Sequence, residues 1–186
     1  MIKYLILLMF LAGCSPKAVD SCQFKTTIYG EIVKHKSLPV VIYVDESFPS
    51  DYYDELTSAV KEINRDRLYI VIYTATTGKT YNYINEIILQ KSWPDNNKQT
   101  QGITSLWYGS SGRIQETDIQ VNVDDYEYSS GIYSFKTLIL HELLHGLGMI
   151  HQEDDSNGIL YPYLAARQVR GMTEREYKNL ECAYGK

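Results

Sequence analysis

The alternation of apolar and polar residues in the first half of the chain predicts two strands with a helix between them. Residues 38–44 and 68–74 are rich in β-branched side chains, which favour strands. Residues 51–65 carry apolar side chains at helical spacing, and Ser50 or Asp51 is placed to cap that helix. The first elements predicted along the chain are therefore a strand, a helix and a second strand.

The middle of the chain predicts three further strands. Residues 85–90 form one apolar run, and residues 102–108 and 114–123 form two more around a glycine-containing turn at 109–112. Within 114–123 apolar residues alternate with polar ones, so one face of this strand should be buried and the other should be polar. The last two strands are expected to form a hairpin.

Two helices are predicted after the strands. Residues 134–147 place four leucines on one stripe. Residues 173–183 begin with Thr173 and carry Glu176 three positions later, which is the pattern of a capping box. The order of elements predicts an α+β fold with a mixed, twisted sheet of about five strands and three helices.

Composition and charge fit a single globular domain. The chain has 186 residues, of which 44% are hydrophobic and 22% charged. Its formal net charge is −5 at pH 7, so no surface is expected that would neutralise nucleic-acid phosphates. Nucleic acid is therefore not expected as a partner. We also expect the protein to be a monomer.

The first residues have the pattern of an export signal. Lys3 precedes an apolar run at residues 4–11 that ends in Leu-Ala-Gly-Cys, with the cysteine at position 14. The run is too short to span a bilayer, which needs about 20 apolar residues. The four-residue sequence resembles a bacterial lipobox. An ordinary secretory signal with an incidental cysteine is the alternative, and it would also export the protein.

The lipobox resemblance implies a lipoprotein anchored outside the cytoplasm. Residues 1–13 would be removed as the signal peptide, and a lipid on Cys14 would hold the protein in the bacterial cell envelope. Residues 14–23 would form a tether, and residues 24–186 would form the domain.

Cys22 and Cys182 lie near opposite ends of the mature chain. In an oxidising compartment they are expected to form a disulfide that closes almost the whole domain. The alternative is two unreacted thiols.

The most informative segment is His-Glu-Leu-Leu-His-Gly-Leu-Gly-Met-Ile-His at residues 141–151. His141 and His145 are four residues apart, so on a helix they point to the same side and can share a metal ion. In a continuous helix, His151 would lie about 15 Å from His141 along the axis. Gly148 can end the helix and turn the chain back, so that His151 becomes the third ligand. Glu142 can then reach a metal-bound water molecule.

This segment matches the metzincin signature H-E-x-x-H-x-x-G-x-x-H, and its surroundings resemble the matrixin branch of zinc proteases. The resemblance covers nearly all of the mature chain. It implies one catalytic Zn²⁺, Glu142 as general base, a cleft between N- and C-terminal subdomains, and hydrolysis of protein or peptide substrates. The rival interpretations are an inactive metzincin-like surface module that binds a partner, and an adhesin with incidental metal affinity.

The resemblance also implies roles for two segments beside the zinc site. Gly102, Ile103 and Thr104 resemble the edge strand on which these proteases bind extended substrates. Residues 157–162 resemble the turn beneath the zinc, which includes Leu160 where the family carries methionine, and Tyr161 and Pro162. Leu160 is expected to pack under the imidazoles.

Other features of the sequence are less specific. Asp124, Asp125 and Glu127 could bind Ca²⁺ as similar residues do in matrixins, although a solvated acidic loop is the preferred interpretation. Gln152, which follows the third histidine, is not diagnostic of any branch of the family. His35, the fourth histidine, is interpreted as an ordinary histidine without a site role.

Overall fold

The computed structural model of the protein describes residues 22–74, 86–91, 100–124, 126, 128 and 130–185. Within these residues the chain forms five strands, three α-helices and one short 3-10 helix, so the predicted α+β class is confirmed. The elements are β1 (Val40–Val44), η1 (Ser50–Tyr52), α1 (Tyr53–Ile63), β2 (Ile70–Thr74), β3 (Glu86–Gln90), β4 (Gly102–Tyr108), β5 (Ile114–Val121), α2 (Phe135–Gly146) and α3 (Glu174–Tyr184). The predicted signal peptide and Cys14 lie outside the described residues.

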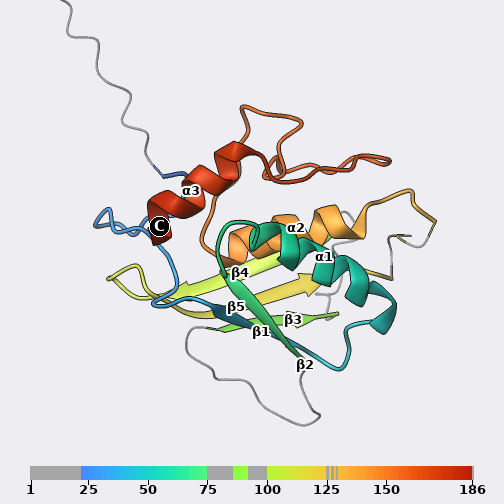
Figure 1. Cartoon of the computed structure of the whole chain (residues 1–186), viewed down its shortest axis with the longest axis horizontal. Coiled ribbons are helices and arrows are strands. Elements are labelled where there is room, and N and C mark those ends of the chain that lie inside the picture. Colours follow the sequence, from blue (N-terminus) through green and yellow to red (C-terminus); the bar gives the residue numbers. More distant parts are fainter. Residues whose placement is uncertain are drawn as a thin grey trace, which may run out of the picture.

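The strands form one mixed sheet in the order β2-β1-β3-β5-β4. Strands β2, β1, β3 and β5 run parallel to one another, whereas β4 runs antiparallel to β5 and forms the predicted hairpin with it. Helices α1 and α2 lie on one face of the sheet, and α3 lies beyond α2 (Figure 1). Strand β4 is therefore an edge strand of the described sheet, and it also contacts α2.

The core lies between the sheet and the two helices that cover it. Alternate residues of β1 are buried, and the four leucines predicted to form a stripe on α2 are fully buried. Strand β5 was predicted to reach residue 123 but stops at Val121, so the alternation of buried and polar side chains ends two residues early. Asn122 was expected on the polar face, but it is buried, and its backbone N–H donates to the Gln101 carbonyl over 2.9 Å.

The start of the first helix differs from the prediction. Neither Ser50 nor Asp51 caps α1 with its side chain. Instead, residues 50–52 form a 3-10 turn in which the Tyr52 N–H donates to the Pro49 carbonyl. This turn supplies backbone acceptors to N–H groups that a side-chain cap would otherwise have satisfied.

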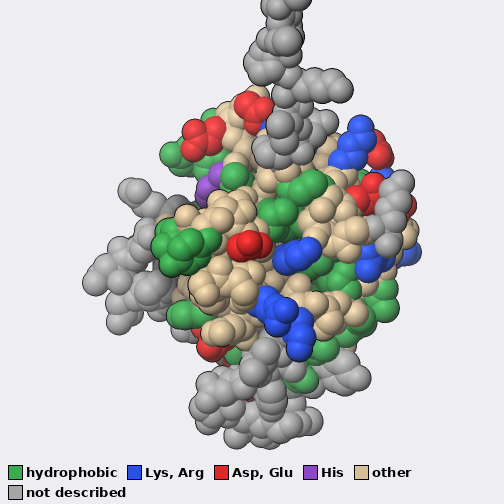
Figure 2. All heavy atoms as spheres, turned by 90° about the vertical axis from the view of Figure 1, so that its left-hand side faces the viewer, with side chains coloured by type: hydrophobic (Ala, Val, Ile, Leu, Met, Phe, Trp, Pro, Cys, Tyr) green, Lys and Arg blue, Asp and Glu red, His purple; other side chains and the backbone are tan. Residues whose placement is uncertain are grey.

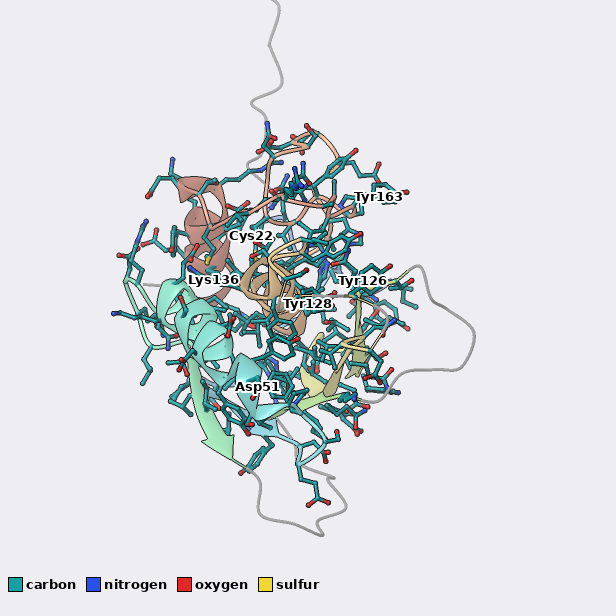
Figure 3. The ribbon with its side chains drawn as sticks, turned by 90° about the vertical axis from the view of Figure 1, so that its right-hand side faces the viewer. Cys22, Asp51, Tyr126, Tyr128, Lys136 and Tyr163 are labelled. Carbon is teal, nitrogen blue, oxygen red and sulfur yellow. A yellow bond between two sulfur atoms is a disulfide. The ribbon has the colours of Figure 1, made fainter. Side chains whose placement is uncertain are left out.

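The last helix, α3, has the predicted capping box and the predicted disulfide. The Thr173 side chain accepts from the backbone at the start of α3, and the Glu176 carboxylate accepts from the Thr173 N–H over 2.7 Å, so the capping box is confirmed. A disulfide joins Cys22 to Cys182 on α3, and Cys22 lies beside that helix in Figure 3. The N-terminal segment is thereby fixed covalently to the last helix.

Charged side chains of both signs are spread over the face shown in Figure 2. An ion pair of 2.7 Å between Lys136 and Glu62 connects α2 to α1. Among the described residues, no helix is both long enough and apolar enough to span a bilayer.

Replacing both Cys22 and Cys182 by Ser should lower the free energy of unfolding by about 5 kcal/mol, because the disulfide closes a loop of 160 residues and restricts the unfolded chain. Urea unfolding with and without reductant measures this. The wild type should lose stability when reduced, while the double variant should be insensitive to reductant. Equal stability of the oxidised wild type and the variant would show that the bond does not stabilise the fold.

Candidate metal centre

Three histidines converge at the end of α2. His141 and His145 project from the same side of the helix, and the chain then reverses at Gly148, whose φ is +102°. This reversal brings His151 to the other two, so that one ligand nitrogen from each ring lies within 4.8 Å of the others. The three histidines that the sequence singled out thus form one cluster.

Backbone carbonyls orient two of the imidazoles. Nδ1 of His141 lies 2.7 Å from the Ile159 carbonyl oxygen, and Nδ1 of His145 lies 2.8 Å from the Met149 carbonyl oxygen. A carbonyl only accepts, so each Nδ1 carries a proton and each Nε2 of a neutral ring is an acceptor. These two Nε2 atoms lie 2.9 Å apart.

Two facing lone pairs repel each other unless a cation lies beside them. Imidazoles whose second nitrogen donates to a carbonyl are the usual histidine ligands of zinc. The donor set therefore fits Zn²⁺.

The electrostatics of the site keep the rings neutral. Burial lowers the pKa of His141 to about 3, with His145 adding to the effect. Burial also lowers the pKa of His145 to about 4 and shifts the pKa of His151 in the same direction. Neutral imidazoles are the form that binds metal, so the ligands are ready at neutral pH.

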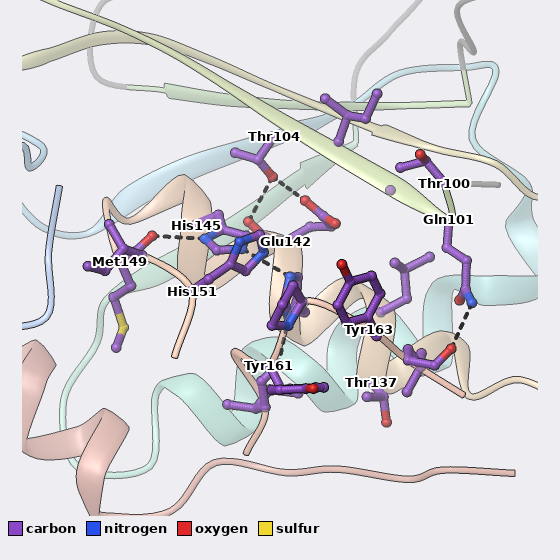
Figure 4. Close-up of a pocket in the computed structure, with 18 of the residues that line it drawn as sticks. Thr100, Gln101, Thr104, Thr137, Glu142, His145, Met149, His151, Tyr161 and Tyr163 are labelled. Atoms are coloured by element: carbon purple, nitrogen blue, oxygen red, sulfur yellow. Dashed lines mark hydrogen bonds between the residues drawn. The ribbon is translucent and has the colours of Figure 1, made fainter. Parts of the chain in front are cut away.

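Glu142 lies between the histidines and strand β4 (Figure 4). Its side chain is buried, and Thr104 Oγ1 donates to its Oε2 over 2.6 Å. Burial raises the pKa of Glu142 to about 7, against the opposite effect of the hydrogen bond from Thr104. A carboxylate with a pKa near neutrality is suited to accept and return a proton.

A cleft of about 780 Å³ opens over these residues. One wall is β4, including Gly102, Ile103 and Thr104, and the facing wall includes Tyr161 and Pro162. The predicted edge strand therefore borders the same cleft as the histidines, and so do Ile159, Tyr161 and Pro162 of the predicted turn.

Leu160 lies behind the cleft wall. Its side chain is fully buried in the core and does not line the cleft. Two backbone carbonyls link this turn to the histidine segment: that of Ile159 accepts from His141, and that of Leu160 accepts from the Gln152 N–H, next to His151. The turn thus orients a ligand through a carbonyl, a contact that the side-chain pattern of the sequence could not reveal.

The remaining candidates lie away from the cluster. His35 does not line the cleft, and its buried Nε2 lies 2.9 Å from the Gly146 carbonyl oxygen. Asp124 forms an ion pair with Lys91 over 2.6 Å. Asp125 and Glu127 lie outside the described residues, so the calcium hypothesis is not tested.

The sequence did not reveal the contact between Thr104 and Glu142 or the presence of Arg170 in the site. The contact of Thr104 with Glu142 joins side chains 38 residues apart. The general alternation of side chains along a strand places Gly102, Thr104 and Leu106 on one face, but it does not say what that face contacts. Arg170, which is buried in the cleft wall, had no sequence signal; its guanidinium donates to the Tyr163 carbonyl over 2.8 Å.

No protein-family model matches the chain. Among solved structures, the chain is similar to high choriolytic enzyme 1, a hatching-enzyme zinc protease from the medaka fish Oryzias latipes, with a TM-score of 0.47 and 14% identity over 88% of this chain and 94% of that one. It is also similar to metalloproteinase-II from Bacteroides fragilis, with a TM-score of 0.48 and 12% identity over 89% of this chain. The match spans 58% of the Bacteroides protein.

Replacing Leu160 by Ala should lower the free energy of unfolding by about 2–5 kcal/mol, because it leaves a cavity in the core. It should also weaken zinc binding, since the Ile159 carbonyl beside it orients His141. Leu160→Met keeps the volume and should cost less than about 1.5 kcal/mol. Urea unfolding and competitive zinc titration measure both effects. Wild-type behaviour of Leu160→Ala would mean that this turn does not support the metal centre.

Proposed function

We propose that the protein is a zinc-dependent endopeptidase of the metzincin type, similar to the matrixins. The observation that carries the proposal is the convergence of three imidazoles beside a buried carboxylate, in a cleft bordered by an edge strand. Three histidine ligands leave a fourth position of a tetrahedral zinc site open, as a catalytic site requires.

Each residue of the cluster has a distinct task in the proposed reaction. His141, His145 and His151 would hold the metal. When bound, zinc supplies Lewis acidity, which polarises a substrate carbonyl and lowers the pKa of a water molecule. Glu142 would take a proton from that water as it attacks the scissile carbonyl and would then deliver the proton to the leaving amine.

The edge strand supports an extended peptide as the substrate. The outer edge of β4 has no strand partner in the described sheet, and its residues line the cleft. A peptide that paired with this edge would lie along the cleft with its backbone next to Glu142. Gly102, Ile103 and Thr104 are the proposed binding segment.

The alternative is a surface module that retains zinc only for stability and binds a partner. A structural metal site has no use for a carboxylate beside its ligands, and burying such a group costs free energy unless it is compensated. The buried Glu142 therefore favours the enzyme.

We further propose that the enzyme acts outside the cytoplasm, anchored to the cell envelope by a lipid on Cys14, and acts on proteins or peptides there as a monomer. The Cys22–Cys182 disulfide supports an oxidising compartment. The anchor itself rests on the lipobox-like sequence.

Replacing Glu142 by Gln should reduce peptide hydrolysis by at least about a hundredfold while zinc stays bound, because the base is lost and the ligands remain. Cleavage of a peptide library, with and without chelator, and zinc content measure this. His151→Ala is the matched comparison and should lose both zinc and activity. Turnover in Glu142→Gln equal to wild type would refute the proposed mechanism, and a wild type without chelator-sensitive cleavage would favour the binding module.

Replacing Cys14 by Ser should release the protein from membranes and leave its specific activity unchanged, because the anchor is a lipid on that side chain. Detergent-phase partitioning and membrane fractionation of cells that express each form provide the measurement. Lys17→Ser, three residues away, is the control. Unchanged partitioning of Cys14→Ser would rule out lipidation at this position.

A further inference from the structure

Strand β4 contacts Glu142 through two of its residues. Gly102 and Thr104 are two positions apart, so they lie on the same face of the strand. One oxygen of the Glu142 carboxylate receives a hydrogen bond from Thr104, and the other lies against the backbone of Gly102. The segment expected to bind substrate thus also surrounds the proposed base.

The hydroxyl of Thr104 has a defined role in this contact. It lies 2.6 Å from Oε2 of Glu142 and 3.1 Å from the Glu142 carbonyl oxygen. When Glu142 is ionised its carboxylate can only accept, so the single Thr104 hydroxyl proton then serves the nearer oxygen, Oε2. A separation of this length is typical of hydrogen bonds to a charged acceptor.

Gly102 supplies the space on the other side. A Cβ atom at this position would lie 2.6 Å from Oε1 and 2.9 Å from both Cγ and Cδ of Glu142. Any side chain at position 102 would therefore displace the carboxylate. The glycine and the threonine restrict the same group by independent means.

We infer that Thr104 is a positioning residue for Glu142 and that Gly102 provides the space this position requires. The inference rests on the proposed peptidase function. Because the substrate is proposed to pair with the outer edge of β4, the same strand would align the peptide and hold the base toward it. Catalytic geometry would then depend on a strand that makes no contact with the metal.

Three variants test this inference by kinetics. Thr104→Val keeps the shape of the side chain and loses the hydroxyl, Thr104→Ser keeps the hydroxyl, and Ser105→Ala removes the neighbouring hydroxyl on the strand. Thr104→Val should lower kcat on the order of tenfold to a hundredfold, with KM and zinc affinity within about twofold of wild type. Thr104→Ser should restore most of kcat, and Ser105→Ala should resemble wild type. A Thr104→Val enzyme with wild-type kcat, or one that loses zinc in proportion to activity, would overturn the inference.

A second measurement does not require activity. The effect of Thr104→Val on the free energy of unfolding is compared in the protein as purified and in a Glu142→Leu background, which has no acceptor. The effect should be larger when Glu142 is present, and equal effects in both backgrounds would refute the contact. If the wild type cleaves no peptide, the proposed function fails. The comparison of unfolding free energies in the two backgrounds still decides whether Thr104 interacts with Glu142.

Discussion

The chain reversal at Gly148 is the constraint on which the metal centre depends. Its φ of +102° is costly for other residues, and a Cβ there would lie 2.1 Å from the Val33 carbonyl oxygen. The reversal brings His151 back to the helix and places the Met149 carbonyl against His145. It also lets the Gly148 carbonyl accept from Lys25 over 2.8 Å. One glycine therefore determines three features: the position of His151, the orientation of the His145 ring and the attachment of the N-terminal segment at Lys25.

Backbone carbonyls orient two of the three imidazole rings. Carbonyls of Met149 and Ile159 fix the His145 and His141 rings, and both belong to segments that follow α2. Such contacts place few demands on the side chains of the supporting residues. Leu160, a buried apolar residue, can therefore hold the turn by packing in the core while its neighbour Ile159 supplies the hydrogen bond.

The features predicted correctly from the sequence are those that a few neighbouring residues determine. The alternating strands, the leucine stripe of α2 and the capping box at Thr173 were recovered because neighbouring residues determine them. The start of α1 was mispredicted because a 3-10 turn replaced the side-chain cap, and Asn122 was misassigned because β5 ends one residue before it.

The histidine cluster was predictable for the same reason, since all three histidines lie within eleven residues around one glycine. The surroundings of Glu142 were not, because Thr104 belongs to a strand 38 residues earlier and meets the glutamate only through packing of β4 on α2. The hydrogen bond from His141 to the Ile159 carbonyl could not be predicted for a different reason: every residue has a backbone carbonyl, so the residue type does not indicate which one accepts. The sequence thus indicated the histidine cluster and the neighbouring glutamate, and the structure revealed the groups that contact them.

X-ray absorption at the zinc edge tests most directly whether three imidazole nitrogens bind one zinc ion. Protein loaded with one equivalent of zinc should show three imidazole ligands and one further light atom at about 2.0–2.1 Å, and His151→Ala should lose one imidazole. A spectrum with sulfur ligands, or one with the same number of imidazoles in wild type and His151→Ala, would contradict the account.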